Sequence, residues 1–206
     1  MPSTIRIAAT PVAVFLLALV GIVYVWSDFG GVHAQFPPQK SAKSAAAPAK
    51  PAVEVRHGAE GLPAPVQEMR EAILSAVHSG RIEDLRTAVE LNELRPAVAE
   101  KAVPDPIAYW RETSGDGEGR DILAALGQLL DSGYVVLPLG RDLENNRVYV
   151  WPYFAEMAID KLTPAQEVEL LRLVPAAAFN DMKKSGRYTY YKLGIGADGT
   201  WHFFIR

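Results

Sequence analysis

Residues 187–206 read RYTYYKLGIGADGTWHFFIR, and this stretch decides the fold class. Asp198-Gly199 separates two runs of aromatic and β-branched residues, which is the pattern of a β-hairpin. Alternation places three apolar side chains of each strand on one face. We expect these sets to be Tyr191, Leu193 and Ile195 in the first strand, and Trp201, Phe203 and Ile205 in the second.

Two further strands are predicted upstream of the hairpin, at 134–139 and 147–151. Helices are predicted from apolar stripes at helical spacing. They are 66–79 and 81–94 (a hairpin joined at Gly80), 105–112, 122–132, 163–174 and 175–185. The apolar stripe of 81–94 consists of Ile82, Leu85, Val89 and Leu94. In the helix 163–174, Val168, Leu171 and Val174 form the expected buried stripe, and Trp201 is expected to pack against it. The sequence therefore predicts an α+β domain, with an N-terminal helical hairpin and further helices packed on a small C-terminal antiparallel sheet.

The N-terminal segment 1–34 is typical of an export signal. Residues 7–27 contain no charged side chain and follow Arg6, and Val32 and Ala34 provide small residues for cleavage after Ala34. The apolar run is also long enough to span a membrane, so a retained single-pass anchor is the alternative. Both alternatives place the rest of the chain outside the cytoplasm, periplasmic or secreted, and contact with the membrane is expected only through residues 7–27 if they remain uncleaved.

Residues 35–65 are rich in Ala, Pro and Lys and poor in large apolar residues, which predicts a disordered linker. This leaves 66–206 as a single globular domain. The chain carries a net charge of −3, residues 1–34 are neutral and residues 35–66 carry +2, so the remainder carries −5. An acidic domain is a poor match for nucleic acid, whose phosphates need clustered Lys and Arg. The absence of cysteine excludes disulfides and thiolate chemistry.

Four segments resemble a group of uncharacterised exported bacterial proteins. These segments are DPIAYWRETSGDGEGRDILAAL, YVWPYFAE, LTPAQEVELLRLV and MKKSGRYTYYKLGIGADGTWHFF. The similarity covers most of residues 66–205. Because the group has no assigned activity, the resemblance implies a fold unit and an exported location but no reaction.

The loop 113–121, TSGDGEGRD, is the weak candidate for a metal site. Asp116, Glu118 and Asp121 offer carboxylate oxygens, which Ca²⁺ prefers, although their spacing differs from that of an EF-hand. The alternatives are an anion at the following helix N-terminus, or a turn in which Asp116 or Glu118 stabilises the start of that helix.

Aromatic residues form the second candidate site. Tyr188 and Tyr190 alternate with Tyr191 and are expected on the opposite face of their strand, and Tyr153 belongs to the same dense aromatic set. If that face is open, it presents phenols suited to a glycan, a peptide or a partner protein. If helices cover it, these tyrosines belong to the core.

No catalytic motif stands out. The four histidines lack metal-ligand spacing, and no phosphate loop or nucleophile elbow is present, so neither a catalytic residue nor a cofactor is predicted. The leading interpretation is a non-enzymatic interaction module for an envelope protein or a cell-wall component. The alternative is a small-molecule-binding or hydrolytic domain with a pocket between sheet and helices. The sequence does not specify an oligomeric state.

Overall fold

The computed structural model describes residues 54–139 and 146–206, which belong to one compact unit. Its α-helices are α1 (Ala64–Ser79), α2 (Leu85–Glu90), α3 (Pro106–Thr113), α4 (Arg120–Asp131), α5 (Pro164–Leu173) and α6 (Ala176–Ser185). Its strands are β1 (Val135–Pro138), β2 (Arg147–Trp151), β3 (Lys192–Gly196) and β4 (Trp201–Ile205). Three short 3-10 helices complete the described elements: η1 (Ile82–Asp84), η2 (Tyr153–Glu156) and η3 (Ile159–Lys161).

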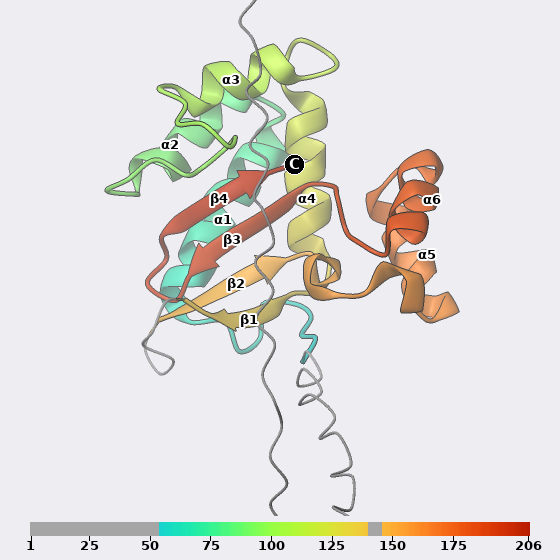
Figure 1. Cartoon of the computed structure of the whole chain (residues 1–206). Helices are drawn as coiled ribbons and strands as arrows, with labels where there is room; N and C mark the ends of the chain where they lie inside the picture. Colours follow the sequence, from blue (N-terminus) through green and yellow to red (C-terminus); the bar gives the residue numbers. More distant parts are fainter. Residues whose placement is uncertain (1–53, 140–145) are drawn as a thin grey trace, which may run out of the picture. The chain divides into compact units, whose positions relative to one another are not determined.

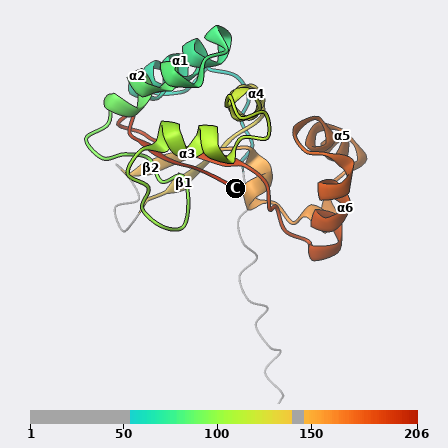
Figure 2. The same cartoon turned by 90° about the horizontal axis from the view of Figure 1, so that it is seen from above.

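The four strands form one antiparallel sheet in the order β1-β2-β3-β4 (Figure 1). The helices α1 and α4 pack on one face of the sheet, whereas α5 and α6 form a pair at its side (Figures 1 and 2). This arrangement confirms the predicted α+β class, with helices ahead of the C-terminal hairpin.

Asp198-Gly199 forms the predicted turn between β3 and β4. The start of β3 and the side-chain faces of β4 differ from the prediction. β3 begins at Lys192, so the aromatic residues 188–191 precede the strand. In β4, Trp201 pairs with Ile195 while Phe203 pairs with Gly194, which makes His202 the extra residue of a β-bulge. The bulge puts Phe204, not Phe203, on the face of Trp201, and the prediction that Trp201, Phe203 and Ile205 share one face was wrong.

The main core lies between the sheet and the helices α1, α3 and α4. Trp110 of α3 stacks on Trp201, with ring centroids 5.4 Å apart, and both side chains are almost fully buried. Tyr149 and Trp151 point to this core from β2, while Val148 and Val150 point to the other side of the sheet. The alternation along β2 therefore gives the sheet two apolar faces.

A second, smaller core joins the other face of the sheet to η2, α5 and α6. It receives Leu170 of α5 and Val174, which directly follows α5, whereas Val168 is 63% exposed and Leu171 is 43% exposed. The predicted stripe of Val168, Leu171 and Val174 was therefore wrong for its first two members. The predicted partner of Trp201 was also wrong, because Trp201 lies in the main core.

The helical hairpin begins as predicted, since α1 ends at Gly80, whose φ of +67° suits glycine. Its second arm is shorter than predicted: η1 and α2 end at Glu90, and Leu94 is 78% exposed. The prediction placed Leu94 in the buried stripe. Just beyond the end of α2, the side chain of Asn92 accepts a hydrogen bond from the main-chain N–H of Trp201 at 2.9 Å.

The last part of the predicted linker belongs to the fold. Arg56 exchanges two main-chain hydrogen bonds with Tyr134, and Leu62 is 5% exposed within the main core. The linker boundary predicted at residue 65 therefore lies too late. The rest of the predicted linker and the segment 1–34 are outside the described residues. Within 54–139 and 146–206, none of the helices has the length and apolar content that a membrane span requires.

Candidate functional site

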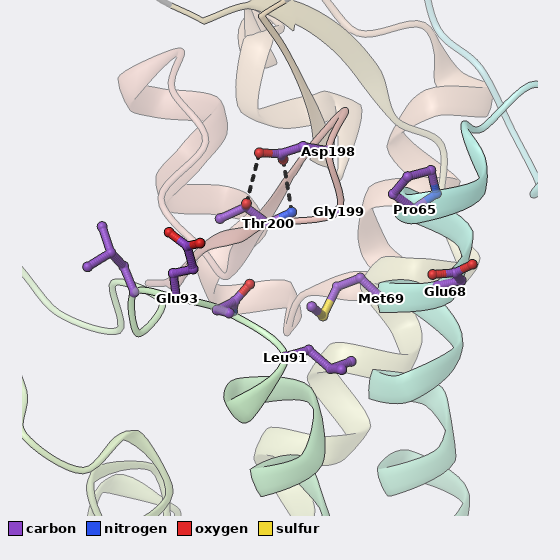
Figure 3. Close-up of a pocket in the computed structure, with 10 residues that line it drawn as sticks. Pro65, Glu68, Met69, Leu91, Glu93, Asp198, Gly199 and Thr200 are labelled. Atoms are coloured by element: carbon purple, nitrogen blue, oxygen red, sulfur yellow. Dashed lines mark hydrogen bonds between the residues drawn. The ribbon is translucent and has the colours of Figure 1, made fainter.

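A groove of about 440 Å³ opens where three segments meet: the start of α1, the chain that follows α2, and the β3–β4 turn. Figure 3 shows Asp198 and Thr200 on the turn above Met69 and Leu91, with Glu93 and Glu68 on opposite sides. The groove therefore combines residues more than a hundred positions apart in the chain.

The β3–β4 turn builds one wall of the groove. The carboxylate of Asp198 accepts hydrogen bonds of 3.0 Å from both the main-chain N–H and the hydroxyl of Thr200 (Figure 3). The main-chain bond is the largest of the effects that hold the pKa of Asp198 below its ordinary value, so this carboxylate is ionised at neutral pH. Gly199 has a φ of +89°, and a Cβ there would lie 2.9 Å from the carbonyl oxygen of Pro65. Glycine thus allows the turn to approach α1 closely.

The chain after α2 builds the opposite wall. Asn92 is fixed by its bond to Trp201, and its buried side-chain nitrogen has no hydrogen-bond partner among the described residues. On either side of it, Leu91 is 62% exposed and Leu94 is 78% exposed. Two exposed leucines beside a hollow are a feature of binding surfaces rather than of a closed core.

The groove is acidic. Glu68, Glu93 and Asp198 line it, and no Lys, Arg or His occurs among the described residues that do so. Three negative charges around a partly apolar hollow favour a ligand that carries both a positive charge and an apolar part.

The three predicted surface tyrosines do not form one surface. Tyr153 is 2% exposed and donates its hydroxyl to Glu169 at 2.8 Å, so it belongs to the second core. Tyr188 is half-buried against that core and donates to the carbonyl oxygen of Tyr191 at 2.7 Å. Burial raises the pKa of both phenols, which remain protonated donors.

Tyr190 is partly accessible, as Tyr188 is, and it also packs against the second core. Its ring packs edge-on against Tyr191, and the Arg206 guanidinium lies 4.9 Å from its centroid. Although residues 188–191 precede the strand, Tyr188 and Tyr190 pack against the second core and Tyr191 packs against the main core, so the predicted opposition of these side chains is confirmed.

The predicted metal loop is organised around a helix start. Asp116 accepts hydrogen bonds from the Ser114 hydroxyl and from the main-chain N–H groups of Glu118, Gly119 and Arg120. Asp121 accepts from the N–H of Gly115 at 2.8 Å. Both aspartates therefore accept hydrogen bonds from groups of the protein itself. No group of three His, Asp or Glu in 54–139 and 146–206 is placed to hold a metal ion. The arrangement is the turn that was the alternative to a calcium site.

Asp116→Asn is expected to reduce the stability of the fold at neutral pH. The Ser114 hydroxyl first, and then the three N–H groups, hold the pKa of Asp116 below its ordinary value. A lowered pKa means that the ionised carboxylate stabilises the fold above about pH 4, and that this contribution disappears as the pH falls through the folded-state pKa. The variant should therefore show a lower urea midpoint at pH 7 and a smaller difference between pH 7 and pH 3.

Glu118→Gln in the same loop is the matched control, because the Glu118 side chain makes only a 3.8 Å ion pair with the exposed Arg120. Its midpoints should follow those of the unaltered protein at both pH values. Equal behaviour of the two variants would show that Asp116 does not stabilise the helix start.

The groove itself was not predicted from the sequence. Its signal was the segment Leu91-Asn-Glu-Leu94, in which two leucines flank two polar residues shortly before Pro96. A helical period assigned Leu94 to the core, whereas a helix ending at Glu90 would have exposed both leucines.

Comparison of the chain with protein-family models, curated proteins and solved structures finds no match.

Proposed function

We propose that this protein is a non-enzymatic binding module that acts outside the cytoplasm and holds an envelope protein through the acidic groove. The observation that carries the proposal is the combination of three carboxylates, without a lining cation among the described residues, and two exposed leucines. A cell-wall polymer is the less suitable partner, because sugars stack on accessible aromatic rings and none lines this groove.

The occupant proposed is a short segment with alternating basic and apolar side chains. Its ammonium or guanidinium groups would pair with Glu68, Glu93 and Asp198, and its apolar side chains would contact Leu91 and Met69. Such pairs at the rim of a groove give specificity and fast association, while the apolar contacts provide most of the affinity.

Calorimetric titration of the purified protein with the peptide acetyl-LKLKL-amide tests this function. Binding is expected, and acetyl-LELEL-amide should not bind, because its charges repeat those of the groove. The double variant Glu68→Gln/Glu93→Gln should weaken binding of LKLKL by about tenfold or more, which corresponds to about 1.4 kcal/mol. Added salt should weaken it as well.

Glu71→Gln is the control for this titration. Glu71 is exposed on the same helix as Glu68 but does not line the groove. The control should bind LKLKL as the unaltered protein does. Binding of both peptides with equal strength, or equal losses in the control and the double variant, would contradict the proposal.

The exported location is a proposal that rests on residues 1–34. Mass spectrometry of the protein purified from cells should find Gln35 at the N-terminus if the segment is cleaved after Ala34. An intact segment 7–27 in the membrane fraction would favour the anchor instead. A full-length chain in the cytoplasmic fraction would overturn the export proposal.

A further inference from the structure

A second cavity, of about 300 Å³, lies apart from the groove and shares no lining residue with it. It forms where His57 of the segment before α1, the C-terminal end of α4, η2 and α5 come together. This volume is at the small end of the range for pockets that hold small molecules.

The walls of this cavity are held by contacts within the protein. The Tyr153 hydroxyl donates to Glu169 Oε2 at 2.8 Å, which ties η2 to α5. The Tyr153 ring stacks on Phe154 with centroids 4.0 Å apart. A Cβ on Gly133 would lie 2.8 Å from His57 Nε2 and 2.8 Å from Tyr153 Cδ1, so glycine makes room for both rings. A cavity fixed in this way needs little rearrangement to accept a ligand.

Charges of both signs line this cavity, and Leu173 provides its accessible apolar surface. The fully buried Phe154 lies behind this surface, and the charged lining residues Asp131, Glu169 and Arg172 are all exposed. Glu169 and Arg172 lie three residues apart on α5, and side chains at this spacing are neighbours on a helix surface. Within the described part of the chain, Arg172 makes no ion pair, and only one oxygen of Glu169 accepts a hydrogen bond.

We propose that this cavity binds a free α-amino acid with an apolar side chain. The Arg172 guanidinium would receive the carboxylate, for which its planar N–H groups are suited. The second oxygen of Glu169 would accept from the ammonium group, and Leu173 would contact the side chain. An α-amino acid carries its ammonium and carboxylate groups close together, and their proposed partners, Glu169 and Arg172, are likewise neighbours on α5.

Calorimetric titration of the protein with L-leucine tests the inference, and two analogues isolate the charges. Isovalerate lacks the ammonium group and isoamylamine lacks the carboxylate. Leucine should bind, and each analogue should bind at least tenfold more weakly. Arg172→Gln and Glu169→Gln should weaken leucine binding by at least tenfold. Glutamine at 169 still offers an oxygen to the Tyr153 hydroxyl, so circular dichroism should show an unchanged fold.

Arg187→Gln is the matched control, since Arg187 is exposed and lies outside the lining of this cavity. It should bind leucine as the unaltered protein does. No binding of leucine at millimolar concentration, equal binding of isovalerate, or equal losses in Arg187→Gln and Arg172→Gln would overturn the inference. Because the LKLKL peptide reports on the groove alone, failure of one site is distinguishable from failure of the other.

Discussion

Trp201→Ala is expected to lower the free energy of unfolding by about 3–5 kcal/mol, the range for truncation of a large buried aromatic side chain. Trp201 has no exposed surface, stacks on Trp110 at 5.4 Å, and donates its indole N–H to the carbonyl oxygen of Phe203 at 3.1 Å. Alanine would lose these contacts and leave a cavity in the main core. The free energy of unfolding of such a domain is only about 5–15 kcal/mol, so this substitution would remove a large part of it.

Urea unfolding followed by circular dichroism measures this loss. Leu94→Ala is the control, because a side chain that is 78% exposed should change stability by less than about 0.5 kcal/mol. A double-mutant cycle between Trp201→Ala and Trp110→Ala should show clear non-additivity, since the rings touch. The same cycle with Leu171→Ala should be additive, because Leu171 lies on α5, away from the main core. Additivity with Trp110→Ala together with non-additivity with Leu171→Ala would mean that Trp201 packs against α5 instead.

Gly119→Ala is expected to destabilise the fold more than Gly117→Ala, although both glycines lie in one loop with similar backbone angles. Their φ values are +80° and +70°, at which a Cβ costs about 1–2 kcal/mol in either case. A Cβ on Gly119 would also lie 2.7 Å from Cβ and 2.8 Å from Cγ1 of the fully buried Ile82, whereas a Cβ on Gly117 meets nothing within 4 Å. Overpacking at Ile82 should add about 1–3 kcal/mol.

The comparison separates backbone strain from the steric clash, because strain is common to both variants. Urea midpoints at pH 7 should be lowered in both variants and lowest in Gly119→Ala, which would be consistent with poor accumulation of that variant in cells. Equal losses in the two variants would mean that Ile82 moves aside without cost, and that the close packing of η1 against the start of α4 contributes nothing measurable.

Several features of the fold follow from local sequence alone. Gly80 and Gly186 end α1 and α6 with φ values of +67° and +69°, and the Thr163–Gln166 capping box starts α5. Asp198-Gly199 makes the predicted turn. These signals act within four or five residues, so the backbone conformation they favour does not depend on the rest of the chain. Together with the apolar periodicity, they suffice to predict helices ahead of a C-terminal antiparallel sheet.

The candidate sites depend on residues that are distant in the sequence. Asn92, just after the second helical arm, accepts a hydrogen bond from the main-chain N–H of Trp201, and the bulge at His202 exchanges the faces of Phe203 and Phe204. The buried side of α5 is the side that contacts η2 and α6. In this packing Leu170 is buried and Val168 is exposed. Periodicity specifies that a helix has an apolar side, but the partner that covers it is selected by the packing of the whole core. For the same reason, neither the acidic groove nor the cavity at Arg172 is visible in the sequence, since each forms only when separate segments meet.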